Sequence, residues 1–161
     1  MTIRAVFDTN TAISAMLWGG VPHRAFNADE TFGVLFFSSP FLLREVATVL
    51  ERAKFDRAFS KITATRARLT SEYFEKVHVV DPKAVPDVIP GDSTDNHVLA
   101  CAVEAQADVV VSGDGHLRDI GSYSGIPIMN AADFLDHLHA SGGDPEAFRR
   151  RTRPSASQSP T

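Results

Sequence analysis

The sequence predicts an α/β domain in which helices cover both faces of a central parallel sheet of about five strands. Two observations lead to this fold class. Strand-like and helical patterns alternate along the chain, and the strand-like runs are apolar throughout rather than at every second residue. A strand that is apolar on both faces needs a helix layer on each side, as in parallel sheets.

The alternation extends over most of the chain. Strand-like runs are expected at residues 3–8, 33–38, 77–80, 108–112 and 126–128. Helical patterns are expected at residues 11–18, 22–29, 40–52, 63–76, 94–106 and 131–140. We therefore place one domain at residues 1–140 and a flexible tail, rich in Arg, Ser and Pro, at residues 141–161.

Composition restricts the class of protein. The 161 residues suit one domain, and a hydrophobic content of 43% is ordinary for a folded chain. The formal charge of −4 gives no overall basic field for nucleic acid, although residues 144–161 hold four arginines. The single cysteine, Cys101, suits a reducing cytoplasm. We find no signal peptide and no apolar run of the roughly 18 residues needed to span a membrane, so a cytoplasmic protein without a membrane partner is expected.

Four carboxylates are candidates for a site at the carboxyl edge of the sheet, where open parallel sheets bind ligands. Asp8 ends the first strand, and Asp114 follows the fourth. Glu45 borders the apolar stripe of its helix, and Asp95 lies on the inward side of the first turn of another helix. All four are therefore expected near one edge of the sheet.

A divalent cation would relieve the repulsion among four carboxylates at neutral pH. Oxygen ligands without clustered His or Cys favour Mg²⁺ or Mn²⁺ over zinc, and such an ion suits the hydrolysis of phosphodiester bonds. Two polar neighbours, Asn10 and Ser112, are candidates for orienting carboxylates or waters.

Each of these residues also has an ordinary structural explanation. Asp8 and Asp95 would cap helices, Glu45 would extend to solvent, and Asp114 would belong to a turn. Trp18 is expected in the core, with stacking on RNA as its alternative.

The motifs together resemble the PIN-domain ribonucleases, in particular the VapC-like toxins of bacterial and archaeal toxin–antitoxin systems. The resemblance extends from about residue 3 to residue 138. Its motifs are Asp8-Thr9-Asn10 after a strand, Glu45 inside a helix, D-x-x-D-N from Asp92 to Asn96, and Ser112-Gly113-Asp114. The segment SAMLWGG at 14–20 also fits one subgroup of the family.

The resemblance implies a three-layer α/β/α PIN-like fold and a Mg²⁺- or Mn²⁺-dependent endoribonuclease. Catalysis and metal binding would fall to Asp8, Glu45, Asp95 and Asp114, with Asp92 and Asn96 in supporting positions. It also implies an RNA substrate, a homodimer and a cognate antitoxin.

Two other functions stay open on the sequence. A non-catalytic PIN-like module that binds RNA or protein would have the same fold. A haloacid-dehalogenase-like phosphatase would also place an Asp after its first strand, and Gly113-Asp114 with Asp119 fits its second motif. However, Asn10 stands where that family has an Asp that transfers protons.

Overall fold

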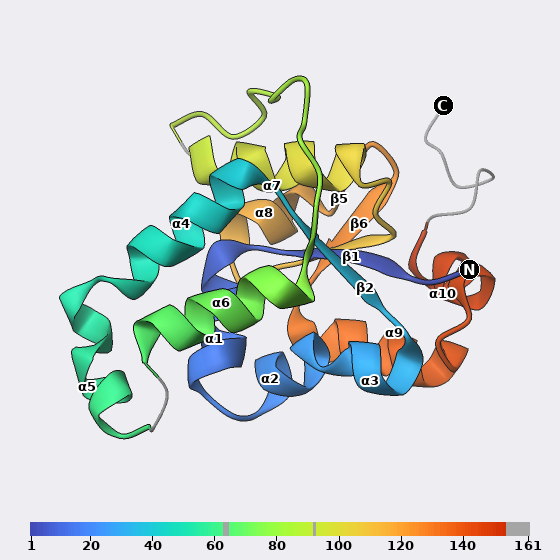
Figure 1. The fold of residues 1–161 in the computed structure, drawn as a ribbon. Helices are drawn as coiled ribbons and strands as arrows, with labels where there is room; N and C mark the ends of the chain where they lie inside the picture. The colour runs from blue at the N-terminus through green and yellow to red at the C-terminus, as the bar shows by residue number, and fades with distance from the viewer. Residues whose placement is uncertain (63–64, 92, 154–161) are drawn as a thin grey trace.

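The structure, a computed structural model, describes residues 1–62, 65–91 and 93–153. It confirms the predicted fold class: a mostly parallel sheet lies between two layers of helices (Figure 1). Within the described residues six strands form this sheet, in the order β3-β2-β1-β4-β6-β5. The strands are β1 (Arg4–Phe7), β2 (Leu35–Ser38), β3 (His78–Val79), β4 (Val109–Val111), β5 (Ser122–Tyr123) and β6 (Ile126–Met129).

Helices connect these strands and cover the sheet. They are α1 (Thr9–Leu17), α2 (Val21–Phe26), α3 (Ala28–Phe32), α4 (Pro40–Leu50), the 3-10 helix η1 (Ala53–Phe55), α5 (Asp56–Ser60), α6 (Arg66–Lys76), α7 (Ser93–Glu104), α8 (Gly115–Ile120), α9 (Ala131–Ser141) and α10 (Pro145–Thr152). None of the helices in the described ranges is long and apolar enough to cross a membrane.

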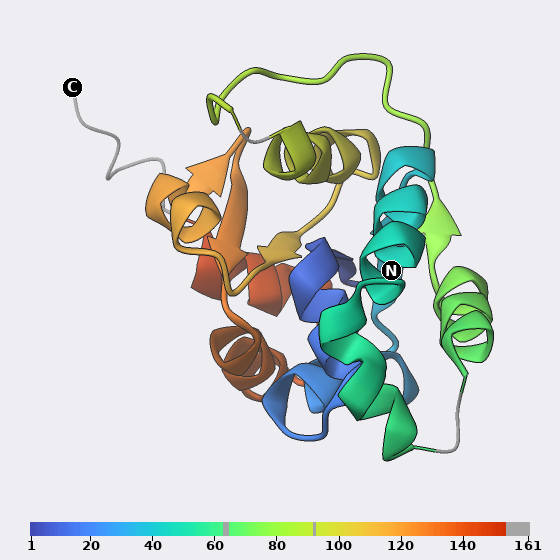
Figure 2. The ribbon, with the colours of Figure 1, turned by 90° about the vertical axis from the view of Figure 1, so that its left-hand side faces the viewer.

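Successive strand residues enter two different cores, which explains why the strands are apolar on both faces. In β1, Ala5 and Phe7 lie in one core and Val6 lies in the other. The first core is completed by side chains from α1, α2, α9 and α10, and the second by side chains from α7 and α8. Figures 1 and 2 show these two groups of helices on opposite faces of the sheet.

The sheet has one strand that the sequence did not predict. β5 pairs with β6 in antiparallel orientation, and the turn between them contains Ser124 and Gly125, both with positive φ values of 50° and 77°. Two consecutive residues with positive φ values are typical of the two-residue loop of a β-hairpin. With two residues, β5 is too short to show a hydrophobic pattern.

The prediction of a flexible tail from residue 141 is wrong for residues 145–152, which form α10. Asp144 caps this helix by accepting a hydrogen bond from the N–H of Ala147 at 3.1 Å. Phe148 is fully buried and packs edge-to-face on Phe134, with ring centroids 6.1 Å apart. One buried aromatic side chain among several arginines gives no apolar stripe, so composition alone suggested a tail. Residues 154–161 of that predicted tail lie outside the described residues.

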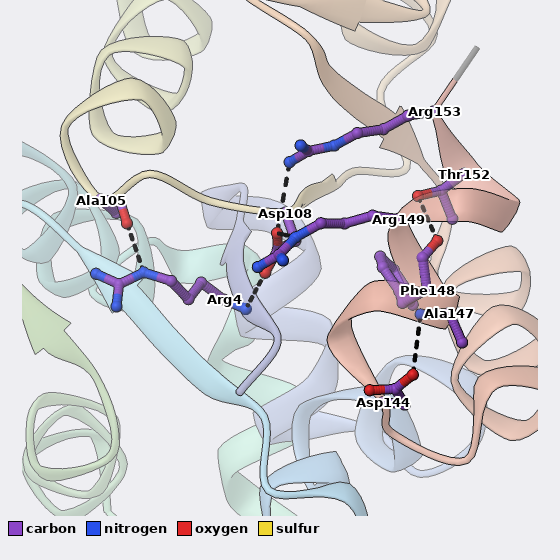
Figure 3. Close-up of polar contacts among 9 residues, drawn as sticks. All are labelled: Arg4, Ala105, Asp108, Asp144, Ala147, Phe148, Arg149, Thr152 and Arg153. Atoms are coloured by element: carbon purple, nitrogen blue, oxygen red, sulfur yellow. Dashed lines mark hydrogen bonds and ion pairs between the residues drawn. The ribbon is translucent and has the colours of Figure 1, made fainter. Parts of the chain in front are cut away.

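Two arginines, one in α10 and one directly after it, attach the helix to the sheet. Nε of Arg149 donates to Oδ1 of Asp108 at 2.7 Å, and Nη2 of Arg153 approaches the same oxygen at 3.4 Å. Asp108 also accepts from the backbone N–H of Arg4 at 2.9 Å (Figure 3). Because Asp108 directly precedes β4, this cluster lies at the amino edge of the sheet.

Candidate active site at the carboxyl edge of the sheet

Two of the four predicted carboxylates lie on the wall of one cavity. The cavity has a volume of about 530 Å³ and is lined by Asp8, which follows β1, and by Asp114, which follows β4. The rest of its wall is formed by the polar residues Asn10, Thr11, Ser14 and Asn130, by Gly113, and by the apolar residues Val21, Pro22, Ala131 and Ala132. The cavity therefore opens at the edge where the sequence predicted a site.

Hydrogen bonds between segments more than 100 residues apart hold the two aspartates in place. Oγ of Ser112 donates to Oδ2 of Asp8 at 2.5 Å and accepts from the N–H of Asp114 at 2.9 Å. The N–H of Gly113 donates to Oγ1 of Thr11 at 3.2 Å. Ser112 thus lies between the two acidic residues, the place that an orienting residue would occupy.

Both aspartates also cap helices, so the structural explanation applies to them as well. Oδ1 of Asp8 accepts from the N–H of Thr11 at 2.8 Å, and Oδ1 of Asp114 accepts from the N–H of His116 at 2.7 Å. Capping alone does not explain the burial of Asp8, which is 5% exposed beside a second acidic residue. A serine or threonine would cap the helix without placing a charge out of contact with water.

The electrostatic environment of Asp8 disfavours its charged form. Burial raises the pKa of Asp8 above its usual value, hydrogen bonds from Ser112 and Thr11 lower it, and the nearby charge of Asp114 raises it further. Burial outweighs the hydrogen bonds in this balance. In the described part of the chain, the ion pairs of lysines and arginines are with other acids and not with Asp8. A cation bound in the cavity would therefore stabilise the carboxylate.

The residues present fit a hydrated Mg²⁺ or Mn²⁺ ion better than a fully protein-bound metal. Among the described residues, no three His, Cys, Asp or Glu side chains lie close enough together to hold a metal ion. Mg²⁺ commonly uses one or two carboxylates, keeps several waters and binds substrate phosphates. Asp8 and Asp114 supply such a pair of hard oxygen donors at a cavity.

The other two predicted carboxylates lie on neighbouring helices. Asp95 is 6% exposed in the first turn of α7, which packs against β1 and α4. Glu45 is half-buried on α4, which packs against α1 and α7. Asp8 lies between β1 and α1, and both of these elements lead into the cavity. Because α7 packs on β1 and α4 packs on α1, both helices are adjacent to the elements that position Asp8. The structure therefore brings two of the four carboxylates together and places the other two on adjacent helices.

Of the predicted supporting residues, one lines the cavity and another lies on a neighbouring helix. Asn10 is exposed and lines the cavity. Asn96 is buried, and its side chain bonds to the backbone of the loop before α7. Oδ1 accepts from the N–H groups of Val88 and Ile89 at 3.1 and 3.0 Å, and Nδ2 donates to the carbonyl of Ile89 at 3.0 Å. Asn96 thus holds this loop against the start of α7, and its supporting role at the site stays a prediction. Asp92 lies outside the described residues.

Sequence analysis missed Asn130. This residue directly follows β6, lines the cavity and caps α9 by accepting from the N–H of Asp133 at 2.8 Å. The signal was present, because a polar residue at the end of a parallel strand is the feature that selected Asp8.

Sequence analysis also missed a buried, hydrogen-bonded pair at the carboxyl end of β2. The hydroxyl of Tyr73 donates to Oγ of Ser38, the last residue of β2, at 3.2 Å. Burial raises the pKa of Tyr73 to about 12, and the charge of Asp8 contributes to this shift. The phenol therefore stays protonated at neutral pH and acts as a donor near the carboxyl edge.

In a comparison with known protein families, residues 4–116 match the PIN domain. No curated protein matches the sequence. The matched region contains all four predicted carboxylates, whereas Asn130 and α10 lie beyond it. The match favours the PIN interpretation over the haloacid-dehalogenase-like one. Because the match covers more than half of the chain, the protein belongs to the PIN domain family, whose members are generally nucleases.

Proposed function

We propose that the protein is a Mg²⁺- or Mn²⁺-dependent endoribonuclease that hydrolyses RNA phosphodiester bonds. One observation carries the proposal. In a PIN domain, the buried Asp8 lies beside Asp114 on a cavity wall, and its charge is not balanced by a basic side chain of the described residues.

In this proposal Asp8 and Asp114 hold the ion, and Asp95 and Glu45 extend the acidic site from α7 and α4. When bound, the ion would neutralise charge on the phosphate and lower the pKa of a water that attacks phosphorus. Ser112 orients Asp8 through the hydrogen bond at 2.5 Å. Asn10 and Asn130 present polar side chains to the same cavity and would contact the phosphate or ribose.

We further propose that this nuclease is the toxin of a toxin–antitoxin pair, acting in the cytoplasm as a homodimer that a cognate antitoxin neutralises. This part of the proposal rests on the motifs that resemble VapC-like toxins, above all SAMLWGG at 14–20. A non-catalytic PIN-like module is the alternative, and it would bind RNA or metal without cleaving RNA.

The test is a cleavage assay on a mixture of single-stranded and structured RNA, with Mg²⁺, with Mn²⁺ and with a chelator. We expect cleavage that requires the metal. Asp8→Asn should lower the rate by at least about 1000-fold, because a ligand of the ion that stabilises the transition state is lost.

The matched control is Asp108→Asn, which makes the same substitution at a buried aspartate on the opposite edge of the sheet. It should cleave RNA within a few-fold of the wild-type rate at temperatures where it is folded. Full metal-dependent cleavage by Asp8→Asn would reject the site. RNA binding by the wild type without cleavage under any metal condition would favour the non-catalytic alternative.

A further inference from the structure

An exposed aromatic side chain lies at the end of α1, in the segment that leads from the cavity to α2. Trp18 is the single tryptophan of the chain and is 51% exposed, so the expectation of a core position is wrong. Its backbone is fixed, because its N–H donates to the carbonyl of Ser14 at 3.0 Å. The exposed ring is thus held on an ordered helix end.

Trp18 lies in the sequence between two residues that line the cavity. Ser14, four residues before it, and Val21, three residues after it, both line the cavity. Asn10 and Ser14 lie on one face of α1 at a spacing of four residues, and Trp18 continues that spacing. At a rise of 1.5 Å per residue, the chain from Asp8 to Trp18 extends about 15 Å. A few nucleotides of single strand would cover this length.

The loop after Trp18 leaves room for a ligand. Gly20 has a φ of 93°, a conformation that residues with a side chain rarely adopt. A Cβ atom added at Gly19 or Gly20 would meet no atom within 4 Å, so the space beside the loop is open.

A basic residue follows the same loop. The backbone N–H of Arg24 donates to the carbonyl of Gly20 at 3.0 Å in the first turn of α2, and Arg24 is exposed. Trp18 and Arg24 are thus exposed before and after the Gly19-Gly20 loop. Exposed aromatic rings and basic side chains together bind single-stranded nucleic acid, with a base on the ring and a phosphate at the cation.

We propose that Trp18 stacks on an unpaired base of the RNA substrate, a few nucleotides from the phosphate at Asp8 and Asp114, and that Arg24 contacts the intervening backbone. This inference rests on the proposed nuclease function and adds a binding subsite to it. Stacking tolerates any base, so the subsite would select single-stranded over duplex RNA rather than one sequence. The positive charge of Arg24 favours nucleic acid over a partner protein as the occupant.

The single tryptophan makes the test direct. The full chain is titrated in a chelator, which prevents cleavage, with a single-stranded oligoribonucleotide and separately with the same sequence as a duplex. We expect the single strand to quench tryptophan fluorescence and the duplex to quench it much less. By fluorescence anisotropy of a labelled oligonucleotide, Trp18→Ala should bind about tenfold more weakly, and Trp18→Phe should bind close to wild type because it keeps a stacking ring.

Phe74→Ala is the matched control, since Phe74 is an aromatic residue on α6 that is 42% exposed and is not part of the cavity wall. Its affinity should equal that of the wild type. Thermal unfolding of each variant would show that the fold is kept.

RNA cleavage by the wild type with Mn²⁺, measured in parallel, separates failure of this inference from failure of the proposed function. Suppose that the wild type cleaves RNA, that the single strand does not quench Trp18 fluorescence, and that Trp18→Ala binds the single strand as tightly as the wild type does. The subsite is then rejected, and the proposed nuclease function is retained. Trp18 would then be open to a protein partner. If the wild type neither binds nor cleaves RNA, both proposals fail.

Discussion

Asp8 and Asp108 are two buried aspartates at opposite edges of the same sheet, and they differ in the groups that donate hydrogen bonds to them. Asp8 follows β1 and accepts hydrogen bonds from neutral groups, the hydroxyl of Ser112 and the N–H of Thr11. Asp108 precedes β4, which runs parallel to β1, and it accepts from the guanidinium of Arg149 at 2.7 Å. Arg153 lies 3.4 Å from the same oxygen of Asp108.

The pKa shifts reflect this difference. The carboxylate of Asp108 raises the pKa of Arg149 through their hydrogen bond, as expected of a balanced ion pair. Burial instead raises the pKa of Asp8. A buried carboxylate whose charge is balanced by arginines serves the fold, whereas one without such a partner is suited to bind a cation from solution.

The largest expected difference between the two edges is the response to metal. Mg²⁺ or Mn²⁺ should stabilise the wild type against unfolding, by about 2.7 kcal/mol at a free concentration 100 times the dissociation constant. Asp8→Asn should lose this stabilisation, and Asp108→Asn should keep it. Urea denaturation with and without metal measures the effect. Equal stabilisation of Asp8→Asn and wild type would place the metal elsewhere.

A smaller difference is expected in the stability of the metal-free protein. Asp108→Asn should lower the free energy of unfolding by about 2 kcal/mol, because the substitution removes charge-assisted hydrogen bonds from arginine. Asp8→Asn should raise it at pH 7, because asparagine keeps the helix cap and removes a buried charge. Chemical denaturation of the three proteins compares them directly. A loss of stability in Asp8→Asn would mean that its charge is balanced in a way the structure does not contain.

The smallest expected effect is the pH dependence that Asp8 imposes. Its folded-state pKa is raised, so the unfolded chain loses this proton first, near the ordinary value of 3.8. The contribution of Asp8 to the stability of the metal-free protein is therefore fully present below that pH. It is lost as the pH rises through the folded-state pKa. Across this pH range, the unfolding free energy of the wild type should fall relative to that of Asp8→Asn as the pH rises. A difference that does not change with pH would show that burial leaves the Asp8 pKa at its ordinary value.

Much of the fold and part of the site followed from local patterns. Apolar strands alternating with helices predicted the layered sheet, and the acidic residues at or shortly after the ends of two strands gave the candidates Asp8 and Asp114. Asn130 also follows a parallel strand, and it was overlooked because the strand-like run before it, the fifth in the sequence, is short and contains a proline. The hydrogen bonds of Asn96 to the loop before α7 were not predictable, because a D-x-x-D-N pattern does not show which backbone groups of a loop need a side-chain partner.

The C-terminal helix shows where local patterns stop being informative. A stretch with one apolar aromatic residue among arginines has the composition of a solvated tail. Its helix is stabilised by Phe148 in the core and by an acid 41 residues earlier in the chain, and neither contact leaves a periodic signal.

The sequence by itself determined the class of fold, the order of its elements and the edge of the sheet at which the acidic residues gather, because these depend on the hydrophobic period and on strand direction. Only the tertiary structure decided which buried charge is balanced. That outcome depends on partners distant in sequence: Ser112, 104 residues from Asp8, and Arg149, 41 residues from Asp108. Charge compensation acts through space, and no local pattern of residues records it.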